Sequence, residues 1–311
     1  MSNIQWTGIT ANPIHLVKAD GKHGGHWCHK ISPGCLHCYA ETMNLSNYFI
    51  FASGLAYSGT VPVNMVFSSI IMEKLVRTKK GERIFIFSMT DCFGDWISDD
   101  TLDLAFAYMV VASQHTFQIL TKRPERMPDY FRSAKEPIRK HVEDLRRELK
   151  LPPAEFVWPI PNLWLGTTIE NQDCTKRIPY LLETESVIWF LSCEPLLERV
   201  TIKKEWLDQI DQVIIGGESG PGARPCDLDW IRFMVTQCQS AEDVAIFVKQ
   251  LGSNPILSAC YIEGVATTYQ KLKLKDKKGG TIEEFPEDVR FRQFPVPRQI
   301  PRQMLPSSLS L

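Results

Sequence analysis

Short apolar runs alternate along the chain with longer segments whose apolar residues recur at helical spacing. Six runs rich in β-branched and aromatic residues predict buried strands: Ile84–Ser88, Phe117–Thr121, Leu163–Thr168, Val187–Leu191, Val213–Ile215 and Ala245–Val248. Four longer segments predict helices: Asp99–Ser113, Arg132–Leu149, Gln172–Glu183 and Leu228–Gln239. A seventh strand is expected within residues 4–10, and a helix over Tyr39–Asn47.

This order of elements predicts an α/β fold with a parallel sheet. Strands that read as continuous apolar runs are buried on both faces, which helices between them accomplish. About six or seven parallel strands favour a partial or complete β/α barrel, with a doubly wound open sheet as the alternative. The 44% hydrophobic and 23% charged residues are typical of a folded chain.

Three of the nine cysteines gather in one short loop. Cys28, Cys35 and Cys38 form a C-x6-C-x2-C pattern, with Ser32-Pro33-Gly34 as the turn between them. Three thiolates around one centre are typical ligands of a 4Fe-4S cluster, and one iron would then lack a protein ligand. Structural zinc completed by His26, His29 or His37 is the main alternative. Unligated thiols are a third interpretation.

Charged and hydrogen-bonding residues follow the predicted strands. In β/α barrels the active site lies at the carboxyl ends of the strands. We therefore expect Lys122, Arg123 and Lys249 to bind an anionic group, and Glu170, Glu194 and Glu218 to accept ammonium or hydroxyl groups. Ser88 and Asp91 are expected at the same mouth, although Asp91 is also suited to cap the following helix. Cys193 is either a hydrogen donor to a product radical or a buried packing residue.

Charge and hydropathy narrow the classes of partner. A balance of 35 basic and 36 acidic residues gives no electrostatic reason for the whole surface to bind nucleic acid or membranes. No apolar run approaches the roughly 20 residues of a membrane helix, and Met1–Trp6 does not resemble a secretory signal, so we expect a cytoplasmic protein. Two basic stretches, 122–150 and 271–278, keep a nucleic-acid partner as a hypothesis.

Several motifs together resemble a poorly characterised family of phage and bacterial proteins that are similar to radical S-adenosylmethionine (SAM) enzymes. These motifs are Trp6-Thr7, Asn12-Pro13, the cysteine loop ending in Cys38-Tyr39-Ala40-Glu41, Leu120–Pro124, Leu191–Leu196 and Gly216–Gly220. The resemblance runs from about residue 4 to about residue 252. Radical SAM enzymes most commonly have C-x3-C-x2-C, so the first spacing here is longer.

The resemblance implies a radical SAM-type barrel over residues 1–252, with a C-terminal extension at 253–292 and a flexible tail at 293–311. It implies that Cys28, Cys35 and Cys38 hold a 4Fe-4S cluster and that SAM binds its open iron. His37 and Tyr39 would then lie near SAM, and Gly216, Gly217 and Glu218 would meet its amino group.

The function expected from this resemblance is reductive cleavage of SAM to a 5'-deoxyadenosyl radical that acts on an unidentified substrate, for which a nucleic acid or nucleoside is one candidate class. A flavodoxin or ferredoxin would supply the electron. Two other functions remain open: a zinc-stabilised nucleic-acid-binding protein without catalysis, and a β/α barrel hydrolase or lyase without radical chemistry.

Overall fold

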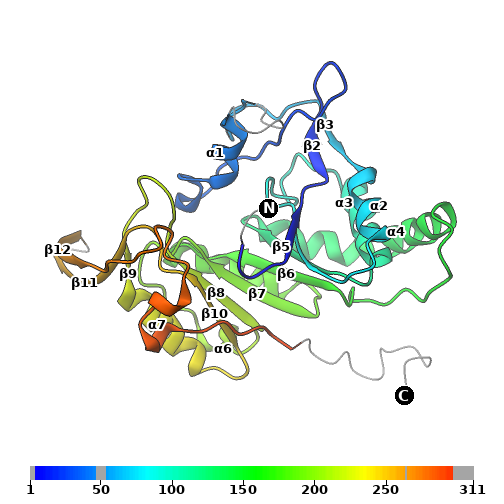
Figure 1. Cartoon of the computed structure of the whole chain (residues 1–311). Coiled ribbons are helices and arrows are strands. Elements are labelled where there is room, and N and C mark those ends of the chain that lie inside the picture. The colour runs from blue at the N-terminus through cyan, green and yellow to red at the C-terminus, as the bar shows by residue number, and fades with distance from the viewer. Residues whose placement is uncertain (1–3, 47–53, 263–264, 297–311) are drawn as a thin grey trace. The chain divides into compact units, whose positions relative to one another are not determined.

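The computed structural model describes residues 4–46, 54–262 and 265–296 (Figure 1). The chain forms two compact units. Unit 1 contains the described residues up to Leu165 and the short segment Glu183–Val187, whereas unit 2 contains Gly166–Leu182 and Ile188–Val296. Within the described ranges, no helix is long and apolar enough to cross a membrane.

A seven-stranded parallel sheet contains all of the strands that the sequence predicts. Its order is β1-β4-β5-β6-β7-β8-β10. The predicted α/β fold, with the strand arrangement of a partial β/α barrel, is confirmed. The strands are β1 (Ile9–Ala11), β4 (Arg83–Ile86), β5 (Thr116–Thr121), β6 (Leu163–Thr168), β7 (Ile188–Cys193), β8 (Gln212–Gly216) and β10 (Ala245–Gln250).

Helices follow most of these strands, as expected for parallel pairing. They are α1 (Tyr39–Leu45), α2 (Ser69–Arg77), α3 (Asp99–Val111), α4 (Met127–Glu148), α5 (Ile178–Leu182), α6 (Lys204–Leu207) and α7 (Leu228–Gln239). The α4 helix begins five residues before the predicted Arg132, because the turn η2 (Pro124–Arg126) leads straight into it and Pro128 occupies its first turn. The turn η3 (Gln172–Arg177) takes up most of the predicted helix at 172–183.

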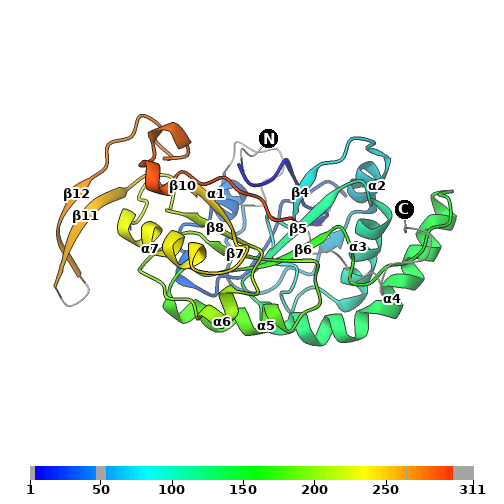
Figure 2. The same cartoon turned by 90° about the horizontal axis from the view of Figure 1, so that it is seen from below.

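Aromatic packing holds α3 and α4 together within unit 1, where α3 also contacts α2 (Figure 2). The ring of Phe106 lies 5.2 Å from that of Phe131 and 5.6 Å from that of Tyr130, measured between centroids. All three side chains are buried, and each contributes about 2–3 kcal/mol by leaving water. The amino-terminal part of the unit adds a small antiparallel pair, β2 (Ile14–Leu16) with β3 (Met65–Phe67).

Unit 2 adds a second small sheet and a covering segment. Its three strands, in the order β12-β11-β9, are β9 (Cys226–Asp227), β11 (Pro255–Ile262) and β12 (Val265–Lys271). The β11–β12 hairpin extends away from α7 and β10 in both cartoons (Figures 1 and 2). Residues 291–293 run beside β10: Val248 donates to Phe291, and Gln293 donates to Ile246. This segment therefore covers the outer edge of the sheet.

Candidate functional site

The cysteine loop of unit 1 closes in two tight turns. The amide of Cys35 donates to the carbonyl of Ser32 at 2.9 Å, which forms the predicted turn at Ser32-Pro33-Gly34 as the short helix η1 (Pro33–Cys35). Cys38 is the N-cap residue of α1. The loop thus stands directly on the amino-terminal end of a helix, where the backbone amides favour negative charge.

Two thiols of this loop share one apolar environment. Cys28 and Cys38 pack against a buried cluster of Ala40, Tyr57 and Met89. Burial, and then the charge of Asp91, raise the pKa of Cys28 to about 12, while the Asp91 amide opposes this shift. Burial also raises the pKa of Cys38, against the opposing effect of the Glu41 and Ala40 amides at the start of α1. Both side chains are half-buried, and each lies against the apolar cluster.

Arg123, at the carboxyl end of β5, fastens the loop from one side. Its guanidinium donates to the carbonyl oxygen of His29 at 3.1 Å and lies 4.9 Å from the ring centre of Trp96. Trp96 in turn meets the buried ring of Trp27 edge-on, with centroids 5.0 Å apart. Arg123 was predicted to bind a ligand, and the structure shows that its guanidinium connects the end of β5 to the cysteine loop.

The opposite side of the loop is fastened to the end of β4. The hydroxyl of Tyr39 donates to the carbonyl of Ser88 at 2.9 Å, and the hydroxyl of Tyr57 donates to the carbonyl of Met89 at 2.8 Å. Asn12 bridges the same turn, because its amide nitrogen donates to Ser88 and its oxygen accepts from the Met89 amide. The predicted residues Ser88 and Tyr39 therefore do lie together.

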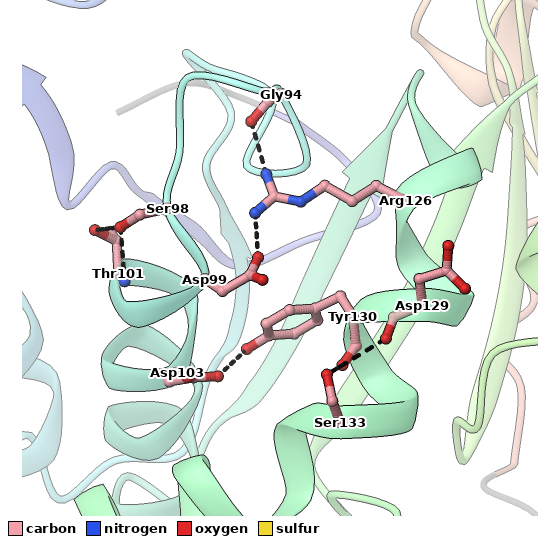
Figure 3. Close-up of polar contacts among 9 residues, drawn as sticks. All are labelled: Gly94, Ser98, Asp99, Thr101, Asp103, Arg126, Asp129, Tyr130 and Ser133. Atoms are coloured by element: carbon pink, nitrogen blue, oxygen red, sulfur yellow. Dashed lines mark hydrogen bonds and ion pairs between the residues drawn. The ribbon is translucent and has the colours of Figure 1, made fainter.

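Asp91 joins the ends of β4 and β5. Its carboxylate accepts from the Thr121 hydroxyl at 2.6 Å, the Lys122 amide at 2.9 Å and the Phe93 amide at 3.1 Å. The alternative role as a helix cap is wrong, because the hydroxyl of Ser98 caps α3 by accepting from the Thr101 amide (Figure 3). Ser98 directly precedes α3 and caps it, so the Asp91 carboxylate instead accepts hydrogen bonds from the end of β5 and from the Phe93 amide.

The loop that follows Asp91 is held by the start of α4. Arg126 donates to the carbonyl of Gly94 at 2.8 Å and pairs with Asp99 (Figure 3). One turn further along α4, the hydroxyl of Tyr130 donates to Asp103 at 2.8 Å. These contacts attach the loop after Asp91 and the first turns of α3 to the start of α4.

Two further predicted residues border the cysteine loop. Lys122 is partly buried, and its charge opposes the rise in the pKa of Cys38. His37 is exposed. Of these two residues, only Lys122 is therefore partly enclosed by the protein.

The described part of the chain contains no cluster suited to a single metal ion. Among the residues that the structure describes, no group of three or more His, Cys, Asp and Glu side chains meets that requirement. Of the histidines predicted as zinc ligands, His26 has its Nδ1 atom 2.9 Å from the carbonyl oxygen of Ile14, and its ring meets that of His23 edge-on. A 4Fe-4S cluster differs in its requirement, since its cysteines bind separate irons and only need to face a shared volume.

In unit 2, the predicted Glu170 forms a buried ion pair. Its carboxylate lies 2.7 Å from the guanidinium of Arg177, which also donates to the carbonyl of Thr168 at 2.8 Å. The side chains are 0% and 5% exposed. The sequence analysis missed Arg177, although a carboxylate at the end of an apolar strand needs a nearby cation to be buried.

Glu194 and Lys249 form a second pair at the ends of β7 and β10. The ammonium nitrogen of Lys249 lies 3.1 Å from Glu194 Oε1, and the Ser192 hydroxyl donates to the other carboxylate oxygen at 3.4 Å. Gly216 lies against this carboxylate, because a β-carbon there would come within 2.6 Å of Glu194 Oε1. The structure thus brings together three residues that were predicted separately.

Glu218 closes the glycine-rich loop on itself. It accepts from the backbone amide of Arg224 at 2.8 Å and from its guanidinium at 2.5 and 3.0 Å. Gly217 is required for close packing, since a β-carbon would lie 2.4 Å from the carbonyl oxygen of Leu251.

Cys193 is fully buried, and burial raises the pKa of its thiol well above the ordinary value. It is therefore held protonated.

Comparison with known proteins identifies a family. No curated protein and no solved structure matches the chain. The model of one family, described as a protein of unknown function (DUF5131), matches residues 1–286, which include the cysteine loop and every strand of both units. The chain belongs to the DUF5131 family of proteins of unknown function.

Proposed function

We propose that this protein is a radical SAM enzyme in which Cys28, Cys35 and Cys38 hold a 4Fe-4S cluster. The observation that carries the proposal is the placement of the cysteines: a tight turn brings Cys35 and Cys38 to the start of α1, and an apolar cluster packs against Cys28 and Cys38. An apolar surround is one of the features by which proteins tune such clusters.

Three thiolate ligands leave one iron open for a small molecule. When bound, such a cluster supplies one electron for the reductive cleavage of SAM, which yields methionine and a 5'-deoxyadenosyl radical. The electron would come from a flavodoxin or ferredoxin. The protein's own part is to hold the loop, bind SAM and exclude water from the radical.

Separate roles for Lys122 and Arg123 follow from their contacts. Lys122 has its charge close to the cysteines, so we assign it to the SAM carboxylate. Arg123 already donates to His29 and stacks on Trp96, so we assign it to positioning the loop. Cys193, kept protonated by burial, remains the proposed hydrogen donor to a product radical.

The test is the formation of 5'-deoxyadenosine by anaerobically reconstituted, reduced protein supplied with SAM. We expect the wild type to form it and Cys35→Ala to lose it. Cys226→Ala is the matched control, because this cysteine is buried in unit 2, outside the loop. Folded wild-type protein that binds one zinc and forms no 5'-deoxyadenosine would overturn the proposal in favour of a structural loop. A hydrolytic activity that persists without all three loop cysteines would favour the barrel hydrolase.

A further inference from the structure

The segment that leaves the β11–β12 hairpin in unit 2 has a regular pattern of exposed lysines. Lys271, Lys273 and Lys275 are exposed, whereas the intervening Leu272 and Leu274 are half-buried. Alternate residues of an extended segment point to the same side and are about 7 Å apart. The leucines therefore attach the segment to the unit, and the lysines form a row directed at solvent.

The turn that follows continues this row and is fixed by hydrogen bonds. The carboxylate of Asp276 accepts from the amides of Lys278 at 2.9 Å and Gly280 at 2.7 Å. Glu284 accepts from the amide of Lys275 at 2.5 Å, and Ser253 donates to the carbonyl of Lys277 at 2.7 Å. Lys277 and Lys278 are exposed on this turn. The two carboxylates thus serve the backbone and hold the lysines in place.

The other basic stretch of the chain is different. On α4, the arginines at 132, 139 and 147 each pair with a carboxylate one turn away. Within the part of the chain that the structure describes, no ion pair involves Lys273, Lys275, Lys277 or Lys278. The two stretches therefore differ in pattern: α4 pairs its arginines with carboxylates of the same helix, whereas residues 271–275 alternate exposed lysines with half-buried leucines.

We propose that the five lysines of 271–278, here called the lysine row, bind the phosphodiester backbone of a nucleic acid. Several exposed ammonium groups along one short segment match a linear polyanion, and binding is driven by the counterions that the neutralised phosphates release. Protein interfaces are instead depleted in lysine and enriched in aromatic residues. The exposed large apolar residues among the described positions of unit 2 are Tyr180 and Val296, both outside the row. The inference names nucleic acid as the substrate class of the proposed enzyme. It rests on the proposed function only for the purpose of binding, because the binding itself involves the lysine row alone.

The test is binding of the full chain to fluorescein-labelled single-stranded RNA, single-stranded DNA and duplex DNA, measured by anisotropy from 50 to 200 mM salt. The variant Lys273→Gln/Lys275→Gln/Lys277→Gln removes three charges of the row. The matched control Lys79→Gln/Lys135→Gln/Lys140→Gln removes three exposed charges of unit 1. Binding needs neither iron nor SAM, so this experiment and the 5'-deoxyadenosine assay fail independently.

We expect the row variant to bind at least about tenfold more weakly at 50 mM salt and its salt dependence to lose about 2 units of slope on single strands. The control should bind like wild type. Equal losses in both variants would show a general charge effect and overturn the proposal. Wild-type protein that ignores all three nucleic acids, or that binds vesicles containing anionic lipid instead, would overturn it as well.

Discussion

The guanidinium of Arg123 donates a 3.1 Å hydrogen bond to the carbonyl oxygen of His29, 94 residues earlier in the chain. This contact joins the end of β5 to the start of the cysteine loop, next to Cys28. With Tyr39 bonded to Ser88 after the end of β4, the loop is fastened to two neighbouring strands. Two strands of the sheet therefore hold the loop in position.

Removing this attachment should expose the thiols. In Arg123→Ala protein without metal, we expect Cys28 and Cys38 to react with a thiol reagent several-fold faster than in wild type, measured by mass spectrometry. Arg123→Lys should recover little, because lysine lacks the planar donor group that stacks on Trp96. Arg132→Ala on α4 is the control. Unchanged reaction rates in Arg123→Ala would contradict the positioning role.

The buried pair of Glu170 and Arg177 should be essential for stability. Arg177→Met leaves an unpaired carboxylate that is 0% exposed, and we expect a loss of about 3–5 kcal/mol in the free energy of unfolding by urea. The double variant Glu170→Gln/Arg177→Met should recover a large part of this loss, because it removes the buried charge. A double variant as unstable as the single one would point to packing rather than charge.

Two histidines should make unit 1 less stable in mild acid. Burial lowers the pKa of His23 and of His26 to about 4, from an ordinary value of 6.5. Between pH 6.5 and 4 the unfolded chain therefore binds more protons than the folded one, so stability falls as the pH falls. The buried His26 adds a slope of at most about 1.4 kcal/mol per pH unit, and the partly exposed His23 adds less because water screens its charge.

Urea unfolding of metal-free protein from pH 7 to 4 checks this expectation. The double variant His23→Gln/His26→Gln should show a shallower pH dependence than wild type over that range. If the free energy of unfolding of the wild type and of the variant depended on pH in the same way, titratable groups other than these two histidines would be responsible.

Gly217 should tolerate no side chain. A β-carbon there would lie 2.4 Å from the Leu251 carbonyl oxygen and 2.9 Å from the Cys226 β-carbon, both of which belong to packed elements. We expect Gly217→Ala to cost about 1–3 kcal/mol in the free energy of unfolding. Gly216→Ala is the comparison, because its nearest neighbour is the movable carboxylate of Glu194. An equal or smaller cost at Gly217 would contradict this packing.

The main elements could be predicted because buried parallel strands leave continuous apolar runs. The short pair β2–β3 was missed, since three residues are too few to show a period, and the hairpin β11–β12 was missed because Ser258, Thr267 and Thr268 interrupt its apolar pattern. Local pattern therefore predicts the large sheet and not the small ones.

The partners of the site residues were harder to predict than the residues themselves. Glu170 and Glu218 were expected to receive a ligand, yet each pairs with an arginine six or seven positions later. Sequence order alone does not show whether such an arginine turns back to the strand end. The hydrogen bond from Arg123 to His29 could not be predicted from sequence either, because it depends on where the fold places two segments that are far apart in the chain.

Iron and acid-labile sulfide content, together with the absorption spectrum, tests the cluster most directly. The protein would be purified without oxygen, as wild type, Cys28→Ala, Cys35→Ala, Cys38→Ala and the control Cys226→Ala. We predict about four irons and four sulfides per chain in the wild type and the control, and loss of both in each loop variant. Colourless wild-type protein that takes up no iron on reconstitution, or loop variants that retain the full iron content, would contradict the assignment of these three cysteines.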